Sequence, residues 1–211
     1  MLARSFAARG LRVLVGSRRP EPPSEGDDGR IQHTPMRTVV AEADVLVLAL
    51  PFSAAVGMAR AGLLGPGLGR PLIDATNPCF DDAADLPPGV SGGGLMARLL
   101  PDWRTVKAFN TVPAAMLAEP MLGARPVTVP VAGDDDEVKD LAARLARLLG
   151  FEPTDAGGMA QAGGLEALAG LLNSISDRNG LAGRVGFQLA RGPAVSAAPR
   201  SRDGGPPSPM R

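Results

Sequence analysis

Residues 12–18 read Arg-Val-Leu-Val-Gly-Ser-Arg, and this stretch decides the fold of the chain. A short aliphatic run ends at Gly16, and a hydroxyl and a guanidinium follow at once. In a dinucleotide-binding βαβ unit, the end of the second strand meets the adenosine ribose. A carboxylate there selects NAD, and an arginine accepts the 2′-phosphate of NADP. Ser17, Arg18 and Arg19 therefore favour NADP(H), although the same residues after an unrelated strand are typical of a solvated turn.

The residues before this stretch predict a helix that leads into it. In residues 1–9, Leu2, Ala3, Phe6 and Ala7 share one helical face, and Gly10 is suited to end the helix. A complete βαβ unit would begin with a further strand and a Gly-x-Gly-x-x-Gly turn, which the sequence does not contain. We therefore expect an N-terminally truncated unit, caused either by a misassigned start codon or by a true loss.

Composition limits the classes of function. Hydrophobic residues make up 45% of the 211 residues, which is enough for a folded core. Lys+Arg and Asp+Glu are 22 each, and this balance argues against a nucleic-acid or membrane-surface binder. The single Cys79 and the single His33 leave almost no material for a disulfide, a zinc site or a His-based triad. No apolar run reaches the ~18 residues of a membrane span, and no secretory signal is visible, so we expect a cytoplasmic protein.

Strand and helix patterns alternate along the chain. Short apolar runs predict strands at residues 45–50, 71–75, 105–109, 127–131 and 151–154. Helical patterns occupy residues 54–64, 92–100 and 134–149, and residues 158–189 read as mostly helical. This alternation indicates an α/β fold with a doubly wound sheet. We expect an NADP-binding domain at residues 1–156, incomplete at its N-terminus, a C-terminal helical segment at 157–190 and a disordered tail at 191–211.

Polar residues stand where the predicted strands end, which is where ligands bind such sheets. Asn77 and Asn110 can each donate and accept hydrogen bonds, which suits a carboxamide such as that of nicotinamide. The alternative is that each asparagine side chain hydrogen-bonds the backbone of its own turn. Pro51 turns the chain toward a nucleotide or simply ends its strand. The three acids at 134–136 predict N-capping rather than a metal site.

The order of six motifs resembles one family over roughly residues 2–190. The motifs are Val-Gly-Ser-Arg (15–18), Ala-Asp-Val-Leu-Val-Leu-Ala-Leu-Pro (43–51), Asp-Ala-Thr-Asn-Pro (74–78), Lys-Ala-Phe-Asn-Thr (107–111), Val-Ala-Gly-Asp-Asp (131–135) and Asp-Ala-Gly-Gly (155–158). Their order is similar to that of the F420-dependent NADP oxidoreductases, which share the N-terminal fold of pyrroline-5-carboxylate reductase. The resemblance implies a Rossmann-like NAD(P)-binding sheet, here lacking its first strand and glycine loop, with a C-terminal helical segment.

The resemblance also implies a reaction and a set of cofactor-binding residues. Hydride would pass directly between NADP(H) and the deazaflavin coenzyme F420, so no catalytic acid–base residue and no metal are required. Ser17 and Arg18 would hold the 2′-phosphate. The nicotinamide ribose and ring would lie near Leu50, Pro51 and the loop Asn110, Thr111, Val112 and Pro113, with the small Ala114 permitting close approach of the rings.

Two alternatives remain open at this point, a non-catalytic nucleotide-binding or sensor protein and an inactive truncated gene product. The sequence leaves undecided the physiological hydride acceptor, the direction of flow and the oligomeric state. Residues 158–189 are apolar enough for a homodimer interface, although they equally suit a cover for the sheet.

Overall fold

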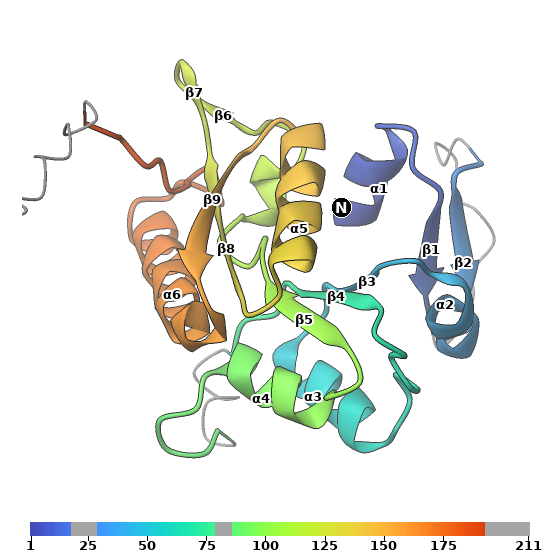
Figure 1. Cartoon of the computed structure of the whole chain (residues 1–211). Coiled ribbons are helices and arrows are strands. Elements are labelled where there is room, and N and C mark those ends of the chain that lie inside the picture. The colour runs from blue at the N-terminus through green and yellow to red at the C-terminus, as the bar shows by residue number, and fades with distance from the viewer. Residues whose placement is uncertain (18–28, 79–85, 193–211) are drawn as a thin grey trace, which may run out of the picture.

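Helices and strands alternate along the chain as the sequence predicts (Figure 1). The computed structural model describes residues 1–17, 29–78 and 86–192. The helices are α1 (Leu2–Ala7), α2 (Met36–Glu42), α3 (Phe52–Arg60), α4 (Gly92–Leu99), α5 (Asp136–Leu148) and α6 (Ala162–Arg178), with short 3-10 turns η2 (Ala114–Met116) and η3 (Met159–Gln161). The strands are β1 (Val13–Gly16), β2 (Ile31–Thr34), β3 (Leu46–Leu48), β4 (Pro71–Asp74), β5 (Arg104–Lys107), β6 (Met121–Leu122), β7 (Arg125–Pro126), β8 (Thr128–Gly133) and β9 (Glu152–Gly157).

The main sheet has five strands in the order β3-β4-β5-β8-β9. Strands β3, β4 and β5 run parallel, whereas β8 is antiparallel to β5 and parallel to β9. The fold is thus a mixed α/β architecture with a mainly parallel sheet, which confirms the predicted fold class. Strands β1 and β2 form a separate parallel pair, and β6 and β7 form a small hairpin that the sequence did not predict.

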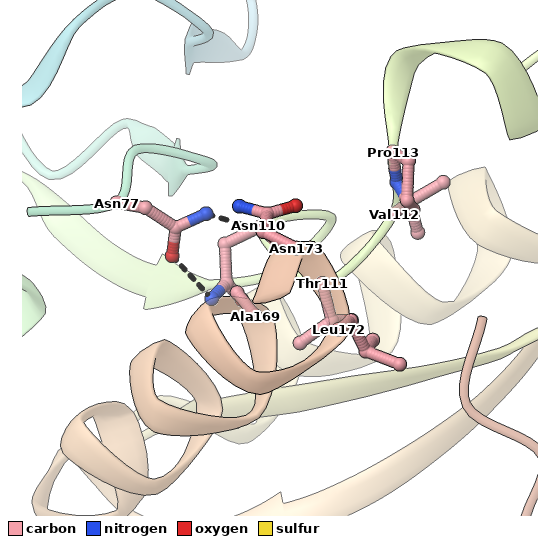
Figure 2. A pocket seen from close by; sticks show the side chains of 8 residues that line it. All are labelled: Asn77, Asn110, Thr111, Val112, Pro113, Ala169, Leu172 and Asn173. Carbon is pink, nitrogen blue, oxygen red and sulfur yellow. Dashed lines mark hydrogen bonds between the residues drawn. The ribbon is translucent and has the colours of Figure 1, made fainter. Parts of the chain in front are cut away.

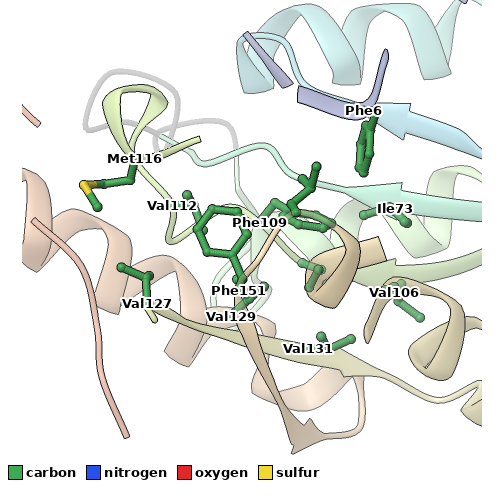
Figure 3. Close-up of a cluster of buried hydrophobic side chains, with 14 of the residues drawn as sticks. Phe6, Ile73, Val106, Phe109, Val112, Met116, Val127, Val129, Val131 and Phe151 are labelled. Carbon is green, nitrogen blue, oxygen red and sulfur yellow. The ribbon is translucent and has the colours of Figure 1, made fainter. Parts of the chain in front are cut away.

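Helices cover the main sheet on two faces and bury one apolar cluster on each (Figure 1). One cluster joins Phe6 of α1, Val138 of α5 and the valines of β8. The other joins α2, α3 and α4 to the opposite face, with Phe52 almost wholly buried. In the first cluster the Phe6 ring meets the Phe109 ring edge-on, with centroids 6.1 Å apart and an interplanar angle of 88° (Figure 3). Helix α1 therefore packs beside the carboxyl end of β5.

Three parts of the chain differ from the sequence-based expectation. Strand β2, which contains His33, and helix α2 form where the sequence analysis predicted neither a strand nor a helix. The expected helical segment at 157–190 is helical only to Arg178. Residues 179–192 then return along β8, where the Thr128 N–H donates to the Phe187 carbonyl at 2.7 Å. The division into a cofactor domain, a helical segment and a tail stays a prediction.

Candidate functional site

Two asparagines from separate strand ends bond each other beside α6. Asn77 follows β4 and Asn110 follows β5. The Asn77 Nδ2 donates to the Asn110 carbonyl at 2.7 Å, and the Asn110 Nδ2 donates to the Asn77 Oδ1 at 2.9 Å (Figure 2). The Asn110 Nδ2 also donates to the Leu165 carbonyl of α6 at 3.1 Å. These bonds tie together two strand ends and one helix.

A pocket of about 190 Å³ opens at this junction. Its lining residues are shown in Figure 2 and comprise Asn77, Asn110, Thr111, Val112, Pro113, Ala169, Leu172 and Asn173. Two lining atoms, the Asn110 Oδ1 and the Thr111 Oγ1, are buried and have no hydrogen-bond partner. An unsatisfied buried polar group costs about 1–3 kcal/mol, which a ligand that bonds to it recovers. The amide oxygen accepts and the hydroxyl can donate, so the pair matches the NH₂ and C=O of a carboxamide.

A strained residue aims the Asn110 loop. Phe109 has φ +65°, a left-handed conformation that bulky side chains rarely adopt. Its ring is buried in the cluster that contains Phe6, and this packing holds the conformation in place. The positive φ of Phe109, two residues after the end of β5, turns the chain so that Asn110 meets Asn77. The sequence motif located this loop, but nothing in it revealed the strain.

A buried ion cluster that the sequence analysis missed lies next to the asparagine pair. The side chains of Lys107 and Asp74 are 0% exposed, and that of Glu166 is 10% exposed. The Lys107 Nζ lies 2.9 Å from the Asp74 Oδ2 and 3.0 Å from the Glu166 Oε1, and it donates to the Thr76 carbonyl at 2.9 Å. The other Asp74 oxygen accepts from the Thr76 N–H and hydroxyl. One ammonium therefore joins β4, β5 and α6.

Glu166 extends this cluster to helix α4. Its carboxylate accepts from the Gly92 N–H at 3.0 Å and the Gly93 N–H at 2.8 Å, the first two residues of α4. Backbone N–H groups at a helix N-terminus favour a carboxylate. A Cβ at Gly93 would lie 3.1 Å from the Lys107 Cδ, so this close approach requires glycine. The glycines at the start of α4 thus allow the helix to pack against the ion cluster.

The predicted cofactor-binding residues fall into three groups. The first group lines the pocket and comprises Asn77, Asn110, Thr111, Val112 and Pro113. The second lies elsewhere: Ser17 follows β1 in the separate strand pair, Leu50 and Pro51 connect β3 to α3, and Ala114 is exposed in η2. The third, Arg18 and Arg19, lies outside the described residues, as does Cys79.

The shifted pKa values belong to surface ion pairs rather than to the pocket. The Arg104 guanidinium hydrogen-bonds the Asp135 carboxylate and lowers the pKa of that carboxyl, while the pKa of Arg104 is raised by the same bond. The Gly157 N–H and then the Lys139 ammonium lower the pKa of Asp155. Asp135 also caps α5 by accepting from the Val138 N–H at 3.0 Å. These groups stabilise the start of α5, at the end of β5 away from Lys107.

The described residues contain neither a cluster of metal-ligating side chains nor a helix that could cross a membrane. Across residues 1–17, 29–78 and 86–192, no three His, Cys, Asp or Glu side chains gather as metal ligands. In that same part of the chain, no helix has the length and apolarity needed to cross a membrane.

This fold is a Rossmann-like α/β architecture of the kind found in NAD(P)-binding reductases. A solved structure of a proposed F420-dependent NADP reductase from Arthrobacter sp. FB24 is similar, with a TM-score of 0.77 and 26% identity over 90% of this chain and 93% of that chain. A hypothetical protein, SMa0349 from Sinorhizobium meliloti, gives a TM-score of 0.65 and 28% identity over 77% of this chain and 81% of that chain. The resemblance predicted from the sequence motifs is thereby confirmed.

A curated relative is more similar in sequence but much longer. Metalloreductase STEAP3 from Rattus norvegicus is 32% identical over 174 residues, which cover 79% of this chain and 34% of the relative. This chain therefore spans about a third of the length of that relative. No protein-family profile matches the chain.

Proposed function

We propose that this protein is an oxidoreductase that transfers hydride between NADP(H) and a second redox partner, with the deazaflavin coenzyme F420 as that partner. The observation that carries the proposal is the pair of unpartnered buried atoms, the Asn110 Oδ1 and the Thr111 Oγ1, in a pocket at the strand ends. Ligands of open α/β sheets bind at this edge. The similarity to a proposed F420-dependent NADP reductase supports the choice of partner.

Asn110 and Thr111 would orient the nicotinamide end of the cofactor. The carboxamide NH₂ would donate to the Asn110 Oδ1, and the carboxamide oxygen would accept from the Thr111 hydroxyl. Asn77 holds Asn110 in place through two hydrogen bonds, so it acts as a support rather than a direct contact. NADP(H) supplies the hydride chemistry, and the protein supplies orientation and exclusion of water.

At the other end of the cofactor, Ser17 and Arg18 would select the 2′-phosphate. Ser17 stands at the carboxyl end of β1, where the adenosine ribose binds in this fold. The sequence contains no Gly-x-Gly-x-x-Gly motif, and the proposal assigns no residue to the diphosphate. Leu50, Pro51 and Ala114 remain predicted neighbours of the nicotinamide and its partner ring.

A second acceptor class is favoured by one observation. The chain is 32% identical to a protein named as a metalloreductase, so a ferric complex is the alternative to a deazaflavin. The two are separated by mixing the protein and NADPH with either acceptor and following deazaflavin absorbance or ferrous product. Turnover of the deazaflavin supports the proposal, and turnover of the ferric chelate alone replaces the named partner. Binding of NADPH without any turnover favours a sensor protein.

The variant Asn110→Ala tests the proposed contact. Losing one hydrogen bond from a buried pair costs about 1–3 kcal/mol, so we expect NADPH affinity to fall roughly 5- to 150-fold. Asn179→Ala is the matched control, because Asn179 is exposed and its Nδ2 donates to the Ile175 carbonyl of α6 at 2.8 Å, away from the pocket. Cofactor fluorescence measures both affinities. Equal affinity in the two variants would contradict the assignment of Asn110.

A further inference from the structure

We propose that Lys107 and Glu166 are positioning residues that set the spacing of α6 from the strand ends and thereby shape the pocket in which the nicotinamide end of the cofactor meets the hydride acceptor. This inference rests on the proposed function. Neither residue lines the pocket, and both lie in the buried ion cluster beside it. They would affect the shape of the pocket indirectly, by holding its two walls in position.

The pocket has two walls that come from distant parts of the chain. One wall is made by the loops that follow β4 and β5, and the other by Ala169, Leu172 and Asn173 of α6. Its shape therefore depends on how far α6 stands from the strand ends. A hydrogen bond from the Asn110 Nδ2 to the Leu165 carbonyl of α6 joins the two walls.

The Lys107 ammonium holds both walls at once. It donates to the Thr76 carbonyl, which is joined directly to the Asn77 nitrogen, and so fixes the loop wall. It also pairs with the Glu166 Oε1 at 3.0 Å, and so fixes the helix wall. Because both contacts end on one buried atom, a change in either moves one wall relative to the other.

Glu166 stands on the face of α6 that leads to the pocket. Ala169 and Asn173 follow it by three and seven residues, a spacing that places all three on one side of a helix. A helix transmits a displacement along its length, since its backbone hydrogen bonds make it stiff. A shift of the Glu166 backbone therefore reaches the pocket wall one and two turns away.

The residues around the ion cluster are closely packed. A Cβ at Gly93 would lie 2.9 Å from the Ala162 Cβ, and a Cβ at Gly92 would lie 3.1 Å from the Glu166 Oε1. The cluster contains two carboxylates and one ammonium. The Gly92 and Gly93 N–H groups also donate to Glu166, and the Thr76 N–H and hydroxyl donate to Asp74. The length of the Glu166 side chain thus fixes the distance between α6 and α4.

The test shortens this side chain by one methylene. In Glu166→Asp, the carboxylate keeps its contacts only if α6 moves inward. A misplacement of about 1 Å can cost on the order of 100-fold in rate, so we expect the KM for the acceptor to rise roughly 10-fold or more. NADPH affinity should fall as well, because the loop wall that moves relative to α6 carries Asn110 and Thr111, the proposed contacts of the nicotinamide carboxamide. Glu166→Gln keeps the length and should retain the acceptor KM within about 3-fold.

Glu119→Asp is the matched control, since Glu119 pairs with Arg184 on the surface with both side chains more than 60% exposed. Amide hydrogen exchange gives a readout independent of activity. In Glu166→Asp we expect faster exchange in residues 110–113 and 165–173, and in Glu119→Asp no change there. If Glu166→Asp fails to fold, Gly93→Ala gives the second perturbation, because its methyl would press on the Lys107 Cδ at 3.1 Å. It should raise the acceptor KM in the same way.

The outcomes separate this inference from the proposed function. An unchanged acceptor KM in Glu166→Asp and in Gly93→Ala overturns the positioning role, even if both variants are less stable. If the unmodified protein turns over no acceptor, the proposed function fails, and exchange then decides the positioning role alone. Unchanged protection of residues 110–113 in Glu166→Asp would overturn it, and faster exchange confined to the two pocket walls would support it.

Discussion

Replacing Lys107 by methionine should destabilise the protein more than any surface substitution. Methionine matches the unbranched shape of the lysine stem but leaves the Asp74 and Glu166 carboxylates without their shared cation. Removing one partner from a buried ion pair costs about 3–5 kcal/mol. For a chain of this size, 1 kcal/mol corresponds to about 2–4 °C in Tm, so we expect Lys107→Met to lower Tm by roughly 6–20 °C.

Urea unfolding followed by tryptophan fluorescence measures this loss. Trp103 is the single tryptophan and is 5% exposed, so its emission reports global unfolding. Arg104→Met on the same strand is the matched control, and it should cost much less because its ion pairs are partly exposed to solvent. Adding Asp74→Asn to Lys107→Met should restore part of the loss, since it removes one uncompensated charge and keeps an acceptor for Thr76. Equal unfolding midpoints for Lys107→Met and Arg104→Met would refute the reasoning.

Three other predictions follow from the structure. Because the pKa of Asp135 is lowered in the folded protein, its carboxylate stabilises the fold at pH values above the pKa of the unfolded chain, near 4, and this stabilisation is lost as the pH falls through the pKa of the folded state. The urea midpoints of the wild type and Asp135→Asn should therefore differ at neutral pH and converge in acid. Ala114→Trp should abolish acceptor reduction while NADPH affinity, measured by cofactor fluorescence, stays within a few-fold, because about 1 Å of ring displacement costs on the order of 100-fold; retained turnover would remove Ala114 from the ring site. Leu171 is 58% exposed on α6. If α6 forms a homodimer interface, Leu171→Glu should yield a monomer by light scattering, and an unchanged molecular mass would contradict an interface at this helix.

The sequence predicted the main sheet well because four of its five strands, all except β9, are largely buried. Such strands read as unbroken apolar runs, as at residues 45–50, where β3 forms at Leu46–Leu48. Strand β2 was missed because Ile31 and Thr34 are buried but Gln32 is exposed, so its sequence shows no apolar run. Helix α2 has only seven residues, too few to show a clear helical period.

Long-range relations could not be obtained from local patterns. The antiparallel pairing of β5 with β8 depends on how the chain returns, which no short motif encodes. The end of α6 at Arg178 was also missed, because apolar residues continue beyond it: six of the 14 residues at 179–192 are apolar, against eight of 17 in the helix. Five of the eight residues that line the pocket were predicted from the strand ends and the family resemblance. The three on α6 were not, since residues such as Ala169 and Leu172 look like ordinary core residues.

One signal for the ion cluster was present in the sequence. Asp74 is the last residue of β4 and Lys107 is the last residue of β5, and parallel neighbours place such ends side by side. In the structure they are direct register partners. A charge of each sign at matching ends of adjacent buried strands therefore predicts a buried pair. Its third member, Glu166, required the fold, because it comes from a helix 59 residues beyond Lys107 in sequence.

The most direct test of the central claim is a fluorescence titration of this protein and of Arg18→Ala with NADPH and with NADH. The account predicts saturable binding, tighter for NADPH than for NADH. A charge-assisted hydrogen bond is worth about 1.5–3 kcal/mol, so Arg18→Ala should weaken NADPH binding roughly 10- to 150-fold and leave NADH binding nearly unchanged. Absence of saturable NADPH binding, or equal losses for the two cofactors, would contradict the account.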